Sequence, residues 1–383
     1  MKNRTIRTMF LAVMILCAMA GRLRAGKDAI SGKLSYDYPT DAILQQVNDQ
    51  IYSPLSFAQA DAGVPEIRII ERKEEDIEYV GDKKDLIETR FWQESPSRII
   101  YHNGKYHTWI MHIEKYIGIH GWDFKNYYLT SDDGYRWNVE GEFPVGERGQ
   151  FDDFRREGLQ VLKFGGKFWM FYASAGRKRP VYDFKLNGIG LLVADSPAGP
   201  WEYAVDGPII KTSIDPTKWD CDGTNNPYPV YFKGKWYVYY KSSNNPQTGS
   251  KTRQGVAISD SITGPYVKYE NNPIFDGHGS FAWVYRGGIA VLPFSSQVIH
   301  WSPDGIHFYN VYTPDGPGAP KVPMLSAFYL PHDPLCGEPV TDQEPDEIWG
   351  LETRSFPMPK KGEPRDWNII RSTVKFNPVK RGK

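Results

Sequence analysis

The sequence lacks an excess of charge of either sign. Among 383 residues, 46 lysines and arginines stand against 46 aspartates and glutamates, so the formal net charge is zero. A neutral chain has no general electrostatic attraction to nucleic acid or to anionic lipid. We therefore expect neither of these among its partners.

Cysteine is scarce, with three residues in the whole chain. Cys17 lies in an N-terminal segment that we expect to be removed, which leaves Cys221 and Cys336. Two cysteines in about 360 residues could pair in an oxidising compartment, but they do not make a disulfide framework. They have no CxxC spacing, and His107 and His112 have no ligand spacing, so we expect no metal and no cofactor.

Long apolar runs are also missing, apart from one at the N-terminus. There, basic residues precede the apolar run Met9–Ala18, and Ala18–Ala20 supplies a small-x-small cleavage site. This pattern predicts a secretory signal peptide over residues 1–20, because the apolar run is too short to span a bilayer. We expect a mature protein that starts near Gly21, has no membrane span, and is secreted or periplasmic.

Aromatic and turn-forming residues are abundant. The chain holds 24 Tyr, 19 Phe and 12 Trp, together with 36 Gly and 29 Pro. So many aromatics exclude disorder as the main state. So many glycines and prolines favour a chain of short strands over a helical bundle. One short helix is expected over residues 40–51, with Thr40 or Asp41 as its N-cap.

Two sequence signals repeat along the chain. The first is a turn followed by an aromatic strand, with copies at Asn103–Trp109, Gly165–Tyr172 and Lys233–Tyr240, and a weaker copy at Arg286–Val291. The second interleaves with it, at Ser131–Trp137, Asp195–Trp201, Asp260–Tyr266 and Ser302–Phe308. The glycines of the second signal, at 134, 199, 264 and 305, are separated by 65, 65 and 41 residues.

Each repeat contains about four short strand patterns, which is typical of a propeller blade. Dividing about 350 mature residues by this period gives about five blades. We therefore predict an all-β fold, a five-bladed β-propeller of mainly antiparallel sheet over residues 91–383. A helical or extended N-terminal appendage over residues 21–90 precedes it. The alternative is a pair of β-sandwich domains, but no linker or composition shift separates two halves.

The first strand of each propeller blade lines the central axis, so residues that enter these strands converge on one site. We locate them by counting nine residues back from the glycine of each turn. From Gly104, Gly166, Gly234 and Gly288 the count gives Ser95, Glu157, Asn225 and Gly279. Beside them lie Glu94, Arg155, Arg156, Asp222, Asn226 and His278. Ionisable and polar groups thus gather at one level of an otherwise apolar set of strands.

This set of side chains suits the hydrolysis of a glycosidic bond. That reaction needs one group to protonate the leaving oxygen and another to activate water or attack carbon. The predicted catalytic residues are Glu94, Glu157, Asp222 and His278. The predicted substrate contacts are Ser95, Asp153, Arg156, Asn226 and Trp283, the last by stacking on a sugar face. Structural roles are the alternative: Glu157 could pair with a neighbouring arginine, and Asp222 could cap its turn.

The repeat positions, with Gly255–Tyr266, Gly277-His278 and Trp283–Tyr285, resemble the five-bladed-propeller glycoside hydrolases. The resemblance is strongest to glycoside hydrolase family 117, exo-acting 3,6-anhydro-L-galactosidases that trim agar oligosaccharides, with family 43 second. It covers roughly residues 90–355. It implies inverting hydrolysis by axial acidic residues, with a histidine, here His278, implicated as the acid.

The sequence departs from that family at the carboxylates. Ser95, Asn226 and Gly279 stand where the resemblance implies Asp, Asp and Glu, and His278 alone carries over directly. The family's N-terminal helical dimerisation segment is not recognisable in residues 27–90, so both a monomer and a homodimer stay open. We predict a secreted exo-glycosidase that acts on a polysaccharide-derived oligosaccharide of anhydrogalactose or galactan type. The alternative is a carbohydrate-binding propeller without catalysis.

Overall fold

The computed structural model describes ten stretches of the chain. They are residues 63–87, 93–116, 122–176, 188–221, 223–243, 252–294, 298–314, 319–323, 327–355 and 367–378. The chain divides into compact units of residues 1–38 and 39–383, and every described residue belongs to the second. The expected signal peptide and the expected helix over residues 40–51 lie outside the described residues. Within the described stretches, no helix is long and apolar enough to cross a membrane.

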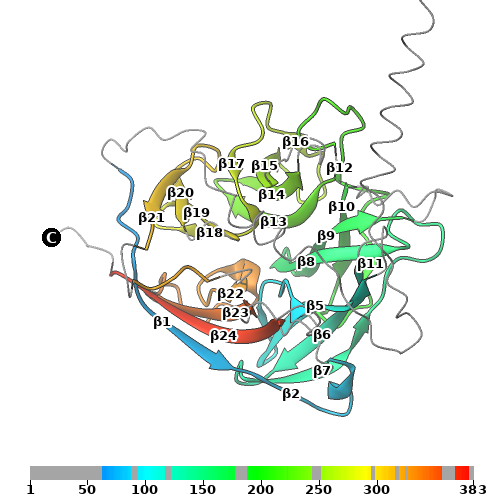
Figure 1. The fold of residues 1–383 in the computed structure, drawn as a ribbon, viewed down its shortest axis with the longest axis horizontal. Helices are drawn as coiled ribbons and strands as arrows, with labels where there is room; N and C mark the ends of the chain where they lie inside the picture. Colours follow the sequence, from blue (N-terminus) through cyan, green and yellow to red (C-terminus); the bar gives the residue numbers. More distant parts are fainter. Residues whose placement is uncertain are drawn as a thin grey trace, which may run out of the picture. The chain divides into compact units, whose positions relative to one another are not determined.

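Five β-sheets surround a common centre within the second unit (Figure 1). Blade 1 runs β2 (Glu78–Val80), β7 (Arg136–Phe143), β6 (Trp122–Ser131), β5 (Lys105–Tyr116) and β3 (Gln93–Glu94), with β4 (Ile100–His102) also paired to β5. Blade 2 runs β11 (Glu202–Tyr203), β10 (Gly188–Ala194), β9 (Lys167–Ala175) and β8 (Arg155–Phe164), with β12 (Ile210–Lys211) on β10. The predicted five-bladed, all-β propeller is confirmed.

The remaining blades have the same plan. Blade 3 runs β13 (Asn225–Phe232), β14 (Lys235–Ser243), β15 (Thr252–Ser259) and β16 (Val267–Lys268), with β17 (Phe275–Asp276) on β15. Blade 4 runs β18 (His278–Tyr285), β19 (Gly288–Phe294), β20 (Ile299–Ser302) and β21 (Tyr309–Tyr312). Blade 5 runs β1 (Ile69–Asp76), β24 (Trp367–Phe376), β23 (Glu347–Ser355) and β22 (Ala327–Tyr329). Short 3₁₀ turns are η1 (Lys84–Leu86) and η4 (Pro334–Cys336).

Blade 5 joins strands from opposite ends of the described chain. The blue strand β1 lies beside the red strand β24 in Figure 1, antiparallel to it from Ile69 opposite Phe376 to Asp76 opposite Ile370. Strand β2 pairs with β7 of blade 1. The propeller therefore starts before residue 91, where we expected its boundary, because two of its sheets take strands from residues 69–80.

The first repeated signal forms the hairpin between the first two strands of blades 1 to 4. Its two turn residues both have positive φ: 51° and 78° at Asn103 and Gly104, 60° and 79° at Gly165 and Gly166, 48° and 79° at Lys233 and Gly234, and 50° and 79° at Arg286 and Gly287. Two such residues define the type I′ turn that matches the twist of a hairpin. Gly287 is therefore the fourth equivalent glycine, which corrects our choice of Gly288, the first residue of β19.

The second repeated signal joins the third and fourth strands of the same blades, and it has two forms. In blades 1 and 4 an aspartate, Asp133 or Asp304, accepts hydrogen bonds from two later backbone N–H groups. In blades 2 and 3 the turn contains a cis peptide bond, Gly199–Pro200 or Gly264–Pro265. The two repeated signals thus alternate along the chain, as predicted. The connection between the third and fourth strands takes one form in blades 1 and 4 and another in blades 2 and 3.

The loop after β22 crosses to the turn ends of blades 1 and 2. Its turn η4 packs against the inner strands β4 and β8, and Leu335 and Cys336 are buried there. Glu338 continues the contact, because its backbone N–H donates to the Tyr101 carbonyl at 2.9 Å and its carboxylate lies 2.7 Å from His102 Nδ1. A pocket of about 610 Å³ lies between this loop and the turns of the neighbouring blades.

Candidate active site

The first strands of blades 1 to 4 each carry one residue at the same level. Glu94 pairs with Met111, Glu157 with Ala173, Asn225 with Lys241, and His278 with Phe294. Each of these partners lies seven residues after the second turn glycine of its blade, at Gly104, Gly166, Gly234 and Gly287. Glu94, Glu157, Asn225 and His278 are therefore structurally equivalent, and we call these four positions the axial ring.

A kink in the backbone follows each position of the axial ring. The next residue is left-handed in each of these blades: Ser95 with φ 52°, Gly158 with 59°, Asn226 with 46° and Gly279 with 52°. In blades 2 to 4 the strand also gains one residue relative to its partner at this point, which is a β-bulge. Bulges turn the entry of a strand and re-aim its side chain, so they set where the ring residues project.

The structure corrects the sequence count by one residue in blades 1 and 4. The nine-residue count holds for Glu157 and Asn225, but at blade 1 it reaches Ser95 instead of Glu94. At blade 4 it starts from the wrong glycine and reaches Gly279 instead of His278. Ser95 and Asn226 are the left-handed residues beside the ring, and Asn225 is the ring residue of blade 3 that we left out of the predicted site.

The side chains of Glu94 and His278 lie outside the described residues, as does the whole of Asp222. No group of three or more His, Cys, Asp or Glu within the described stretches could hold a metal ion.

Glu157 is the ring carboxylate whose contacts are described. The Asn225 Nδ2 donates to Glu157 Oε1, and Arg155 Nη1 lies 3.5 Å from Glu157 Oε2. Asn225 is itself oriented, because its Oδ1 accepts from the backbone N–H of Asn226 at 2.6 Å. The Glu157 side chain is 12% exposed. The carboxylate is therefore held by an amide from blade 3 and by a long arginine contact from its own blade.

Arg156 has a structural role, which corrects the prediction that it contacts substrate. It is 6% exposed, and its Nε donates to Asp152 Oδ2 at 2.7 Å. Its two other nitrogens donate to the Pro144 carbonyl at 3.0 Å and to the Tyr203 hydroxyl at 3.1 Å. Tyr203 donates in turn to Asp152 Oδ1, and burial together with that carboxylate raises the pKa of Tyr203 to about 12. Each nitrogen of the guanidinium thus donates a hydrogen bond inside the protein.

Two further predicted contacts are buried. Asp153 is 5% exposed, and its Oδ2 accepts from the backbone N–H of Gly149 at 2.7 Å, which fixes the loop before β8. Trp283 is 1% exposed and packs against Phe281 and Tyr285 with ring centroids 5.2 and 5.8 Å apart. Its faces belong to the core, so a sugar has no access to them. This corrects the predicted stacking role of Trp283.

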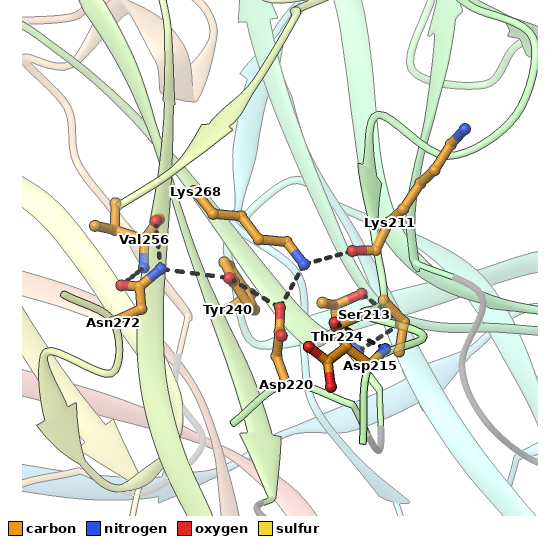
Figure 2. Close-up of polar contacts among 10 residues, drawn as sticks. Lys211, Ser213, Asp215, Asp220, Thr224, Tyr240, Val256, Lys268 and Asn272 are labelled. Atoms are coloured by element: carbon orange, nitrogen blue, oxygen red, sulfur yellow. Dashed lines mark hydrogen bonds and ion pairs between the residues drawn. The ribbon is translucent and has the colours of Figure 1, made fainter. Parts of the chain in front are cut away.

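The loop that carries Asp222 is anchored to blade 3 by a buried charge network (Figure 2). Asp220 is 3% exposed and accepts hydrogen bonds from Lys268 Nζ and from the Tyr240 hydroxyl. Lys268 also donates to the Lys211 carbonyl at 2.6 Å. Asn272 extends the network by donating to Tyr240 at 3.4 Å. One lysine thus ties both ends of the loop, residues 211 and 220, to the outer strand β16.

The two cysteines of the expected mature chain do not form a disulfide bond. Cys221 lies in the anchored loop and Cys336 in η4, and both are buried as free thiols. The Cys221 thiol donates to the Pro216 carbonyl at 3.7 Å. The pairing that we considered for an oxidising compartment is absent from the fold.

Five blades around an axis, with polar residues at one level of the innermost strands of blades 1 to 4, define a five-bladed β-propeller. Among solved structures the chain is similar to Zg3597, a family 117 glycoside hydrolase of the marine bacterium Zobellia galactanivorans. The identity is 20%, the match covers 82% of this chain and 92% of that one, and the TM-score is 0.65. The resemblance to family 117 is thus confirmed at the level of the fold.

Two other solved structures share the fold. One is described as a glycoside hydrolase, with 14% identity, 83% of this chain and 94% of that chain covered, and a TM-score of 0.55. The other is described as a complex of BT0996 and RGII, with 14% identity, coverages of 80% and 92%, and a TM-score of 0.54. By sequence, no protein-family profile and no curated protein matches.

Proposed function

We propose that the protein is a secreted, exo-acting glycoside hydrolase whose active site is the axial ring. The observation that carries the proposal is the equivalence of Glu94, Glu157 and His278 at one level of adjacent blades. The reaction needs an acid and a second group that is a base or a nucleophile, and three residues of suitable type occupy that level. The glycosidase fold of the structural neighbours supports the same reaction class.

Each residue has a definite role in this proposal. His278, as an imidazolium, donates a proton to the leaving oxygen. Glu157, oriented by Asn225, accepts a proton from a water molecule that attacks the anomeric carbon. Glu94 is the second carboxylate of the proposed site. Asp222, on the anchored loop, and the left-handed residues Ser95 and Asn226 contact the sugar around this centre.

Exo action and the proposed substrate, an anhydrogalactose- or galactan-type oligosaccharide, rest on the resemblance to family 117. The blade 5 loop crosses the turn ends of blades 1 and 2, which lie at the opposite end of the inner strands from the ring. The N-terminal signal pattern supports secretion.

Hydrolysis assays on a panel of marine and plant oligosaccharides test this proposal, with Glu157→Gln and His278→Ala as the variants. We expect each variant to lower kcat/KM by roughly 10²-fold or more, the usual scale for the loss of an acid or a base. Glu202→Gln is the matched control, because Glu202 is an exposed residue on the outer strand of the same blade. Full activity in both ring variants would refute the assignment.

A carbohydrate-binding propeller without catalysis is the second candidate. The observation in its favour is that Asn225 occupies the ring position of blade 3, so this blade brings no carboxylate to that level. It predicts no turnover by the unaltered protein, with saturable sugar binding by calorimetry. In that case Glu157→Gln would weaken the affinity for the sugar, and neither the variant nor the unaltered protein would hydrolyse it.

A further inference from the structure

The pocket of about 610 Å³ lies at the end of the inner strands opposite the axial ring. Lys163 of β8, Tyr231 of β13 and Val284 of β18 line it. Each of them pairs with the second residue after the turn glycine of its blade, so the three positions are structurally equivalent. The loop after β22 lines the pocket with His332–Leu335, Gly337 and Glu344. We call this cavity the turn-face pocket.

Buried side chains separate the turn-face pocket from the axial ring. Gln160, Tyr228 and Phe281 share one level between the two, because each pairs with the fifth residue after its turn glycine. All three are buried. Six residues of strand separate Glu157 from Lys163, which at about 3.3 Å each puts the ring and the pocket roughly 20 Å apart. A molecule in the pocket therefore does not contact the ring residues.

The type I′ turn of blade 2 leaves the rim of the pocket open. Its first residue is Gly165, with φ 60°. The same turn position in blades 1, 3 and 4 holds residues with side chains at φ of 48° to 51°: Asn103, Lys233 and Arg286. The turn therefore does not demand glycine there. A Cβ placed on Gly165 or Gly166 would meet no atom within 4 Å, so both glycines border open space.

Two aromatic rings line the pocket. The ring centroids of Phe164 and Tyr231 lie 5.4 Å apart with their planes at 51°, and both rings pack on the buried Trp236. Tyr231 is 38% exposed. Aromatic faces of this kind pack against the apolar face of a ligand. A cavity of this volume, with apolar walls and a few polar groups, is typical of a small-molecule site.

Each charged group that lines the pocket has an opposite charge beside it. The pairs are Lys163 with Glu338 at 3.6 Å, Glu344 with Arg286, and Asp333 with Arg98. Burial raises the pKa of Glu344, and the charge of Arg286 and its backbone N–H, which donates to Glu344 Oε1 at 2.9 Å, oppose the rise. Burial lowers the pKa of His332 more than Asp333 raises it, so this imidazole is neutral near pH 7. Balanced charges of this kind favour an uncharged ligand over an ionic one.

We propose that the turn-face pocket binds uncharged sugar units as a second, non-catalytic site. The apolar face of a sugar ring packs on Phe164 and Tyr231, and its hydroxyls donate to Glu344 and accept from Lys163. The choice of a sugar among uncharged ligands rests on the proposed function. The pocket itself does not rest on it. Two sites on one chain would hold the protein on a polysaccharide by avidity.

Crystals of the full chain soaked with neoagarotetraose or with galactotriose, two uncharged galactan-type sugars, test the site without a variant. We expect sugar density in contact with Phe164 and Tyr231. Sugar at the axial ring alone, or no bound sugar, would overturn the inference. Sugar in the pocket of a protein that shows no hydrolysis would support the inference and refute the proposed hydrolysis, so the two failures are distinguishable.

Calorimetry with neoagarotetraose measures the same site in solution, in a Glu157→Gln background that prevents turnover. Tyr231→Ala removes one aromatic face, and Gly165→Lys copies the blade 3 turn and places a side chain at the rim. Each should raise the Kd of the pocket site by about 10-fold or more.

Tyr135→Ala is the matched control, because Tyr135 is also exposed, at 36%, and lies beside the outer strand of blade 1. It should leave the Kd unchanged. A Kd that is the same in all these variants would overturn the inference. If Tyr231→Ala does not fold, Gly165→Lys and the soaked crystals decide the question.

Discussion

At the scale of single residues, the pair Glu157–Asn225 is the most informative contact of the candidate site. The amide of Asn225 donates to the carboxylate of Glu157, and Asn225 is fixed by its own bond to the next backbone N–H. An amide at this place orients the carboxylate of Glu157 without adding charge. A carboxylate at the same place would compete with it.

Asn225→Asp should therefore shift the pH profile of hydrolysis. Two carboxylates in contact cannot both ionise easily, so the substitution raises the pKa of the pair. The limb of the kcat/KM profile that Glu157 controls should move to higher pH by about one unit or more. Asn310→Asp, on the exposed outer strand of blade 4, should leave the profile in place. An unshifted pH profile in Asn225→Asp would show that Glu157 does not take part in the proposed hydrolysis.

At the scale of elements, the turns between third and fourth strands contribute pH-dependent stability. Burial opposes the ionised form of Asp304, but hydrogen bonds from His307 and from two backbone N–H groups outweigh it and lower its pKa to about 2. Because the pKa falls below the ordinary 3.8, this stability is fully present above pH 3.8 and is lost as the pH falls through about 2.

Asp304→Ala should thus lower the unfolding free energy at pH 7 by about 1 kcal/mol, a value reduced for solvent screening. The Asp304 side chain is 47% exposed, so the full linkage value does not apply. The Tm difference between the two proteins should shrink as the pH falls from about 4 towards 2. Asp260→Ala, in the matching turn of blade 3, is the control, because Asp260 contacts only Lys235 at the surface. A difference that is constant with pH would contradict the assignment.

The anchored loop gives a second prediction at this scale. Lys268→Met leaves the buried Asp220 carboxylate without its cation, so we expect a loss of about 1 to 3 kcal/mol in unfolding free energy. Lys235→Met removes an exposed lysine of the same blade, whose partner Asp260 is 84% exposed, and should change the unfolding free energy little. Chemical denaturation measures both. Equal losses of unfolding free energy would show that the contact of Lys268 with Asp220 stabilises the fold no more than a surface pair does.

At the scale of the whole molecule, closure of the propeller depends on β1, which completes blade 5. Arg72 of this strand donates to Glu352 Oε1 of β23 at 2.5 Å, and the Glu352 side chain is 4% exposed. Arg72→Met takes this cation away from a buried carboxylate, and we expect a loss of about 3 kcal/mol and a lower Tm. Arg68→Met removes a surface pair with Glu66 and should change Tm little. Similar Tm values for the two variants would mean that the last blade does not need this contact.

The repeat predicted the blades because each blade must build the same hairpin and the same outer connection. Asn103-Gly104 and Lys233-Gly234 show it: the type I′ turn demands residues that tolerate positive φ, and this demand is visible in sequence. The strand β1 could not be predicted, since no turn of this kind marks it and its partner β24 is some 300 residues away.

The ring was only partly visible in sequence. Glu157 and Asn225 followed from a fixed count, whereas Glu94 and His278 needed a correction of one residue. In blade 4 the count began at Gly288 instead of Gly287, and in blade 1 the ring residue lies ten residues before Gly104. Arg156, Asp153 and Trp283 are of suitable type for sugar contact, but burial decides their role, and burial depends on the neighbouring blade.

By itself, the sequence determined that this protein is a five-bladed β-propeller, since periodic turns and alternating apolar strands are local properties of the chain. Only the tertiary structure decided which polar residues share one level of the axis and which form buried hydrogen bonds and ion pairs instead. The reason is physical: the ring Glu94, Glu157, Asn225 and His278 is set by β-bulges and by the pairing of each strand with its neighbour. Partners such as Asp152 for Arg156 are fixed only when the loops around each blade have packed.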